Sequence, residues 1–199
     1  MKVLYEDNNG NKVALINENY KPPKGELKYI FKGKNSTLLL GDNLKLVSCN
    51  FVLGDNCEIS IGNNCFLRGK LFAAHPFSKI NVGSHTKFNA LCRLHAAEGK
   101  SITIGEHCLL SNVRFRTSDS HSIIDLNMNS RINHAKDIII GDNVWIAEEV
   151  NIYKGVIIES GSVIGARSTV TKSLPGNSLC VGSPAVVVKS NISWDEALL

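Results

Sequence analysis

One histidine stands in a segment whose composition suits chemistry better than packing. His121 lies in a polar stretch, residues 116–137, that is rich in Ser, Asn and Asp and interrupts an otherwise regular repeat. An imidazole titrates near neutrality and can take a proton from a hydroxyl group, as a general base does. The alternative is an ordinary solvated loop histidine. We take His121 as the candidate for proton transfer.

A tryptophan offers a second candidate. Trp145 is the middle residue of Val144-Trp145-Ile146, where the outer two residues are expected to face a core. Side chains alternate along a strand, so the indole should point outward, where another subunit or a ligand must cover it. Its N–H, or a nearby backbone N–H, could face a developing oxyanion. Packing between subunits is the alternative role.

Basic residues gather around the polar stretch. Arg114 and Arg116 precede it, and Lys87 and Arg93 lie about one coil earlier, a coil being three of the six-residue repeats described below. Guanidinium groups pair with carboxylates through two parallel hydrogen bonds, so such a rim suits an acidic acceptor, for example a carboxylated sugar. Four solvated side chains are the alternative.

The elements that must position these residues repeat every six positions. Aliphatic residues recur at this spacing from Ile140 to Val170, and a small residue follows each of the first five by four positions. No α-helix or ordinary hairpin has this period, whereas a short strand plus a turn does. Three such units close a triangular coil of 18 residues. The sequence therefore predicts an all-β parallel β-helix.

The turns and cysteines fit the same coil. In the Gly-Asp-Asn and Gly-Glu-His turns, we expect Gly to supply φ > 0 and Asn or Asp to tolerate the left-handed region. His85 and His107 take the Asn position, which predicts stacked corner residues rather than ligands. There is no CxxC pair, and the cysteines at inward positions are predicted to be reduced, small apolar residues: Cys57, Cys65, Cys92 and Cys108.

The spacing also divides the chain. Residues 1–36 carry no hexads and are predicted to form short strands or an arm, whereas 37–184 form the β-helix, with a loop inserted at about 116–137. Residues 185–199 should form a strand and a short helix that opens at the capping box Ser193-Trp194-Asp195-Glu196. A long loop that leaves a compact solenoid is usually functional.

Composition excludes some classes. A net charge of +4 on 199 residues is too small to predict a nucleic-acid partner. No run of about 18 apolar residues occurs, so no membrane span is expected. Because the N-terminus lacks an apolar signal core, we expect a cytoplasmic protein.

The joint order of several motifs resembles the hexapeptide-repeat acetyltransferases, a family of left-handed parallel β-helices that use acetyl-CoA. The loop around His121 is most similar to that of the O-acetyltransferases of bacterial capsules, including those of polysialic acid. The motifs span about residues 100–190: Ser118-Asp119-Ser120-His121-Ser122, Arg131 to Asp137, Asn143-Val144-Trp145-Ile146, Val163 to Lys172, and Gly182-Ser183-Pro184-Ala185.

The resemblance implies roles for particular residues. His121 would be the base, with Asp119 or Asp125 orienting its ring, and Trp145 would line the acetyl tunnel. Acetyl-CoA would be the co-substrate, no metal is implied, and a homotrimer would form three sites at its seams. The residues implied in binding the donor are Ala147 and Ala166 along the pantetheine arm, and Arg167, Thr171, Lys172 and Lys189 towards the phosphates. For both lysines, an ordinary solvated role is the alternative.

The predicted function is direct transfer of acetyl from acetyl-CoA to a hydroxyl of an acidic glycan, with sialic acid of a bacterial capsular polysaccharide as the acceptor. The supply of acetyl-CoA places the reaction in the cytoplasm, with capsule-assembly proteins at the inner face of the membrane as a candidate location. Three alternatives stay open: an N-acetyltransferase of an amino sugar, a zinc enzyme of the carbonic-anhydrase type on the same fold, and a β-helix without activity.

Overall fold

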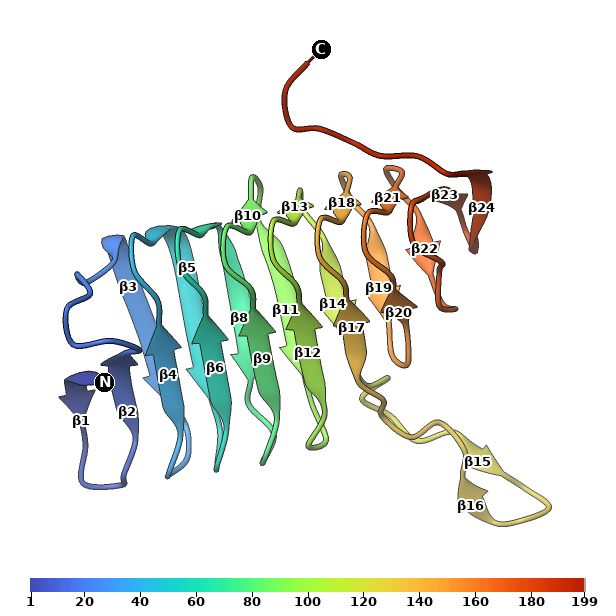
Figure 1. The fold of residues 1–199 in the computed structure, drawn as a ribbon. Helices are drawn as coiled ribbons and strands as arrows, with labels where there is room; N and C mark the ends of the chain where they lie inside the picture. Colours follow the sequence, from blue (N-terminus) through green and yellow to red (C-terminus); the bar gives the residue numbers. More distant parts are fainter. Residues whose placement is uncertain (199) are drawn as a thin grey trace.

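The computed structural model describes residues 1–198, and its strands form a three-sided prism (Figure 1). The chain visits the first, second and third faces in turn, and within the coils a strand pairs in parallel with the strand one coil later, for example β12 with β17, β13 with β18 and β14 with β19. The first face is an eight-stranded sheet of β1 (Lys2–Glu6), β2 (Lys12–Leu15), β4 (Thr37–Leu40), β6 (Glu58–Ile61), β9 (Lys79–Val82), β12 (Ser101–Ile104), β17 (Ile138–Ile140) and β20 (Ile157–Ile158).

The other two faces are arms of one sheet that meet at the long strand β5 (Lys45–Leu53), against which β3 (Lys24–Phe31) also pairs. The second face contains β7 (Phe66–Leu67), β10 (Lys87–Phe88), β13 (Leu109–Leu110), β18 (Trp145–Ile146), β21 (Val163–Ile164), β23 (Ser178–Gly182) and β24 (Ala185–Ser190). The third contains β8 (Gly69–Ala73), β11 (Cys92–Ala96), β14 (Arg114–Arg116), β19 (Asn151–Tyr153) and β22 (Thr169–Val170).

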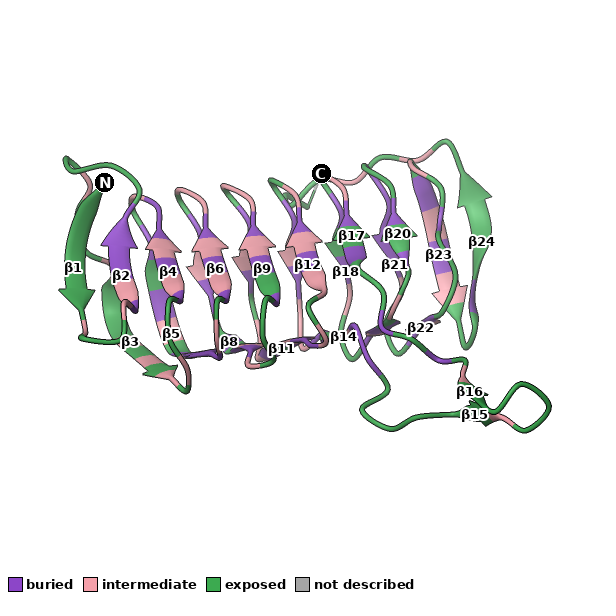
Figure 2. Ribbon diagram, turned by 90° about the horizontal axis from the view of Figure 1, so that it is seen from below, coloured by how far each residue is buried: buried purple, intermediate pink, exposed green. Residues whose placement is uncertain are grey.

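The core runs along the inside of the prism (Figure 2). The aliphatic residues of the hexads stack coil on coil, and Val144 and Ile146 are fully buried while Trp145 is 38% exposed. The predicted alternation of inward and outward residues is therefore confirmed. One inward column of the first face, at most 3% exposed, consists of Leu40, Ile61, Val82, Ile104, Ile140 and Ile158.

The corner between the first and second faces is built from left-handed residues. The rings of His85 and His107 stack with centroids 4.6 Å apart and planes 1° apart, which confirms the prediction of stacked corner residues. Asn64 lies one coil before His85, and its Nδ2 atom is 3.4 Å from Nε2 of the His85 ring. The residues at this position have φ between 50° and 62°: Asn43, Asn64, His85, His107 and Asn143.

The glycines of these turns act differently from the prediction. Gly83 has no positive φ, because the left-handed residue of its turn is His85. A Cβ on Gly83 would lie 2.5 Å from the carbonyl carbon of Gly105 in the next coil. Glycine is required here because successive coils approach closely, so the prediction of φ > 0 at this position was wrong.

The cysteines follow their prediction. All six lie inside the prism, buried and free of disulfide bonds. Burial raises the pKa of Cys92 to about 12 and that of Cys108 to about 11. These thiols therefore stay protonated at neutral pH and behave as small apolar side chains.

The two ends of the prism differ. Within residues 1–36, β2 and β3 pair in parallel with β4 and β5 and so continue the faces of the prism. After the antiparallel pair β23 and β24, the chain turns back as an extended tail (Figure 1). No helix long and apolar enough to cross a bilayer is found within residues 1–198.

The predicted C-terminal helix was wrong, since residues 1–198 contain no helix. In a capping box, Glu196 would accept a hydrogen bond from the backbone N–H of Ser193. Its carboxylate instead binds Lys87, and the indole of Trp194 donates to the carbonyl of Asn143. Contacts with distant coils therefore hold this segment in an extended form.

Candidate active site

The insert is an excursion between the third and first faces. Strand β14 ends at Arg116 and β17 begins at Ile138, and between them β15 (Ile124–Asp125) and β16 (Ser130–Arg131) form a small antiparallel hairpin. The hairpin projects from the prism on the side away from the C-terminal tail (Figures 1 and 2). His121 lies in the stem before the hairpin and is exposed.

Two ion pairs hold the stem of the insert to the prism. Arg131 forms two hydrogen bonds, of 2.6 and 2.9 Å, with the carboxylate of Glu98, and Lys154 pairs with Asp119. The hydrogen bonds from Arg131 and Ser118 lower the pKa of Glu98 to about 2. Both carboxylates are therefore ionised at neutral pH.

Within residues 1–198, neither aspartate that was predicted to orient the ring of His121 forms a hydrogen bond or an ion pair with it. Asp119 binds Lys154 and the side-chain amide of Asn133, and the pKa of its carboxyl is lowered, first by Lys154. Asp125 accepts hydrogen bonds from backbone N–H groups at the hairpin turn. The insert is therefore held through its backbone near His121 and not through the imidazole.

Three of the four predicted acceptor residues come together on the third face. Arg93 and Arg114 are in register on β11 and β14, and Arg116 is in register with His95. These arginines line a groove of about 440 Å³ whose wall includes Phe72. Within residues 1–198, none of the three takes part in an ion pair.

The groove adjoins the insert. The guanidinium of Arg116 donates to the Ser120 hydroxyl at 2.7 Å, directly before His121. Burial, together with the nearby Arg116 and His75, lowers the pKa of His95. The floor of the groove therefore holds a neutral imidazole among cationic side chains.

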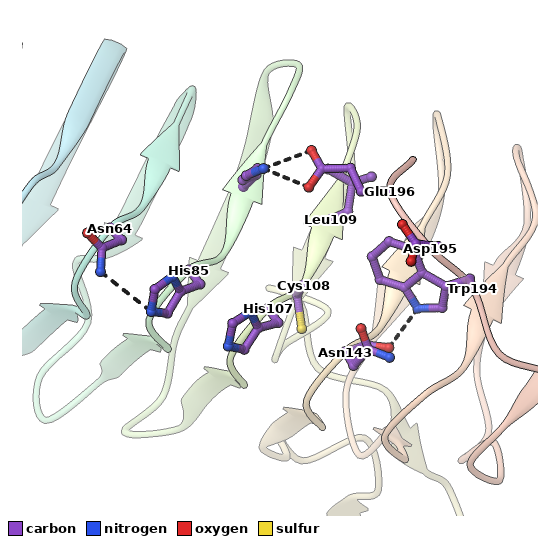
Figure 3. A pocket seen from close by; sticks show the side chains of 10 residues that line it. Asn64, His85, His107, Cys108, Leu109, Asn143, Trp194, Asp195 and Glu196 are labelled. Atoms are coloured by element: carbon purple, nitrogen blue, oxygen red, sulfur yellow. Dashed lines mark hydrogen bonds and ion pairs between the residues drawn. The ribbon is translucent and has the colours of Figure 1, made fainter. Parts of the chain in front are cut away.

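Lys87 does not join this group. It lies on β10 of the second face, where its ammonium binds the two carboxylate oxygens of Glu196 at 2.6 and 2.8 Å (Figure 3). The fourth residue of the predicted basic rim is therefore separated from the arginines and already neutralised.

Trp145 lies on the second face, and the tail packs beside it. The indoles of Trp145 and Trp194 have centroids 6.0 Å apart. Trp194 Nε1 donates to the Asn143 carbonyl at 2.7 Å (Figure 3). The sequence reasoning did not include Trp194 in the site. No motif connects the two tryptophans along the chain, so the contact is visible only in the fold.

The residues expected to bind the donor occupy three places on one chain. Ala147, Ala166 and Arg167 form turns between the second and third faces, and the Arg167 guanidinium lies 3.0 Å from the Glu149 carboxylate. Thr171 and Lys172 follow β22, and Lys189 lies on β24, paired with Leu179.

The geometry also separates His121 from Trp145. In a triangular coil, the corner between the third and first faces is opposite the second face, and Trp145 points outward from that face. One chain alone therefore does not bring the two side chains together.

Three comparisons place the chain among known proteins. A family model described as bacterial transferase hexapeptide (six repeats) matches residues 137–172. The polysialic acid O-acetyltransferase of Neisseria meningitidis is 35% identical over 169 residues, which is 83% of this chain and 78% of that protein. The polysialic acid O-acetyltransferase of Escherichia coli O1:K1 is 36% identical over 137 residues, which is 68% of this chain but 44% of that protein.

The fold agrees with these matches. The crystal structure of the polySia-specific acetyltransferase NeuO superposes with a TM-score of 0.84 and 36% identity, covering 96% of this chain and 88% of that chain. The chain therefore belongs to the hexapeptide-repeat O-acetyltransferases.

Proposed function

We propose that the protein acetylates a sugar hydroxyl of an acidic glycan and that sialic acid residues of a bacterial capsular polysaccharide are its acceptors. Two relatives named as polysialic acid O-acetyltransferases support the acceptor class. The observation that carries the proposal is the group of arginines without carboxylate partners beside the insert.

The third face presents its charges in a row. Lys70, Arg93 and Arg114 are in register on three successive coils, with neighbouring strands about 4.8 Å apart. Like charges directly opposite each other destabilise a sheet. Carboxylates of a bound glycan would relieve this repulsion and pair with the guanidinium groups in the bidentate geometry that arginine favours.

His121 is the proposed general base. It takes the proton from the acceptor hydroxyl, whose oxygen attacks the thioester carbonyl of acetyl-CoA. The tetrahedral intermediate then collapses, the bond to sulfur breaks, and the imidazolium returns the proton to the leaving thiolate. Trp145 lines the path of the acetyl group, and its N–H or a neighbouring backbone N–H faces the oxyanion.

Direct transfer needs no acetylated enzyme. A thiol nucleophile would have to be exposed and partly ionised, whereas the cysteines are buried. The mechanism therefore proceeds through one intermediate between two bound substrates.

The donor would run along the turns of the last coils. The backbone at Ala147 and Ala166 contacts the pantetheine arm, and Arg167, Thr171, Lys172 and Lys189 meet the phosphates. The ion pair between Arg167 and Glu149 is exposed, and such pairs contribute little, so the guanidinium is available for an incoming phosphate.

We further propose a homotrimer in which His121 of one chain meets Trp145 of the next. The opposite placement of the two residues on one prism supports a shared site. Exposed apolar residues in the strands, Ile139 at 43% and Ile157 at 45%, provide surface for contacts between subunits.

The test combines a variant with an acceptor panel. His121→Ala should lower turnover roughly 10²–10⁴-fold, because a positioned base contributes about that much. Affinity for CoA should stay unchanged. His134→Ala is the matched control, because His134 is another exposed histidine of the same insert. Wild-type turnover in the His121 variant would remove that residue from the role.

The panel contains polysialic acid, a neutral polysaccharide, free neutral sugars and an amino sugar, with transfer read as acetate incorporation. Polysialic acid should be the preferred acceptor, and preference for the amino sugar would favour N-acetyl transfer instead. For the zinc alternative, the rings of His85 and His107 stack face to face as corner residues and do not converge on one point.

A further inference from the structure

One asparagine in the insert is unusually buried. Asn133 is 8% exposed, whereas the neighbouring His134 and the residues of the hairpin tip are exposed. A buried polar side chain in a mainly exposed loop must find its partners within the loop, because an unmet amide group costs free energy. Its hydrogen bonds therefore show which segments of the insert it holds together.

The side chain of Asn133 bonds to the backbone of His121 and of Ile123, and to the side chain of Asp119. Its Nδ2 group donates to the carbonyl oxygen of His121 at 2.8 Å and to Oδ2 of Asp119 at 2.8 Å. Its Oδ1 atom accepts from the backbone N–H of Ile123 at 2.7 Å and from Nε of Arg131 at 3.2 Å. Both amide hydrogens and both lone-pair positions of the oxygen are therefore used.

Asn133 is itself tied to the prism. Its carbonyl oxygen accepts from Nζ of Lys154 at 2.9 Å and from Nη2 of Arg131 at 3.2 Å. Lys154 directly follows β19, and Arg131 binds Glu98, which follows β11. A continuous set of hydrogen bonds thus runs from two rigid coils through Asn133 to the backbone of His121.

We propose that Asn133 is a positioning residue for His121: it binds the main chain at the histidine and two residues after it, and the Asp119 side chain two residues before it, and so holds the imidazole where the acceptor proton must be removed. This inference rests on the proposed role of His121 as the base. The imidazole itself makes no hydrogen bond within residues 1–198, so its position depends on the backbone that carries it. Small misplacements of a catalytic group can cost about 100-fold in rate.

The first test is kinetic. Asn133→Ala should lower kcat about 10- to 100-fold while the KM for acetyl-CoA changes by less than about twofold, because the proposed donor contacts lie elsewhere. Asn133→Asp should be equally impaired, since its carboxylate has the size of the amide but cannot donate to Asp119 or His121. Asn127→Ala, at the exposed tip of the same hairpin, is the matched control and should retain full activity.

The second test separates positioning from a purely structural role. If Asn133 acts through His121, adding Asn133→Ala to His121→Ala should cause no further loss of the residual rate. Hydrogen exchange should show faster exchange at the Ile123 amide in Asn133→Ala, with the strands of the prism protected as in the wild type.

The outcomes are distinct. A multiplicative loss in the double variant, or normal kcat in Asn133→Ala, would overturn the positioning role. Should the residual rate of His121→Ala be too low to measure, unchanged exchange at Ile123 in Asn133→Ala would overturn it instead. Wild-type turnover in His121→Ala would remove His121 from the role of base, and with it the ground of this inference, whatever Asn133 does.

Discussion

At the scale of single residues, two arginines of the third face lie opposite each other without acidic partners among the described residues. Arg93 and Arg114 stand in register on adjacent strands, and neither has a carboxylate partner within residues 1–198. The free protein therefore carries repulsion that a bound polyanion removes. This arrangement favours anion recognition over a role in stability.

Replacement of these arginines should therefore weaken binding of the acceptor without destabilising the fold. Arg93→Gln and Arg114→Gln should each raise the KM for polysialic acid about tenfold, because each removes one charge-assisted hydrogen bond to the acceptor. The melting temperature should stay the same or rise, since repulsion is relieved. Steady-state kinetics at low salt against polysialic acid measure the effect.

Lys79→Gln on the first face serves as the control, because Lys79 is exposed but lies in a different sheet. An unchanged KM in both arginine variants would show that the acceptor lies elsewhere.

At the scale of elements, the insert is a loop whose stem is rigidly built and whose hairpin is not packed. The ion pairs from Glu98 and Asp119 close the stem, while Leu126 at the tip is 92% exposed. The same loop thus contains a fixed segment, which carries His121, and a segment that is open to contacts outside the chain.

The stem should open in acid. The pKa of Glu98 falls from its ordinary 4.5 to about 2 in the folded protein. Because the pKa is lowered on folding, the pair with Arg131 contributes its full stabilisation of the folded state above pH 4.5. This stabilisation is lost as the pH falls towards 2 and Glu98 becomes protonated. The side-chain amide NMR signals of Asn133 should shift over this range.

Glu98→Gln should give the shifted amide signals already at neutral pH, because the ion pair with Arg131 is removed. Signals that stay constant down to pH 2 in the wild-type protein would contradict the assigned role of the pair.

Much of this architecture was predictable, because the hexads report a local period. Val144-Trp145-Ile146 specifies which side chains enter the core, and the excess residues before Ile138 locate the insert. Lys87 was grouped with Arg93 because distance along the chain was compared instead of strand order around a coil. Counting strands after Val82 would have placed Lys87 one face before Arg93.

Other features depend on contacts that no local pattern reports. The capping box at Ser193 predicted a helix, but Glu196 and Trp194 bind residues of coils far along the sequence. The role of Asn133 was equally hidden, because its partners become neighbours only when the two strands of the insert stem meet.

At the scale of the whole molecule, the prism divides the proposed site between surfaces that face different directions. The insert that carries His121 projects from the corner between the third and first faces. Trp145 points outward from the second face, on the opposite side of the prism. In the proposed trimer, each of the three active sites would draw on two chains.

A mixing experiment tests this directly. His121→Ala chains and Trp145→Ala chains should each be inactive alone, but after co-refolding in equal amounts about a quarter of wild-type activity should return, because one seam in four pairs an intact histidine with an intact tryptophan. Mixing without subunit exchange is the control. No recovery in verified mixed trimers would place both residues in one chain's site.

The buried thiols have a practical consequence. Burial raises the pKa of Cys65 to about 11 and that of Cys92 to about 12, so maleimides meet almost no thiolate in the native protein. A cysteine substituted for Asn127 would become the fast-reacting sulfur, and a spin label or fluorophore attached there could report where the hairpin tip rests in the assembled enzyme.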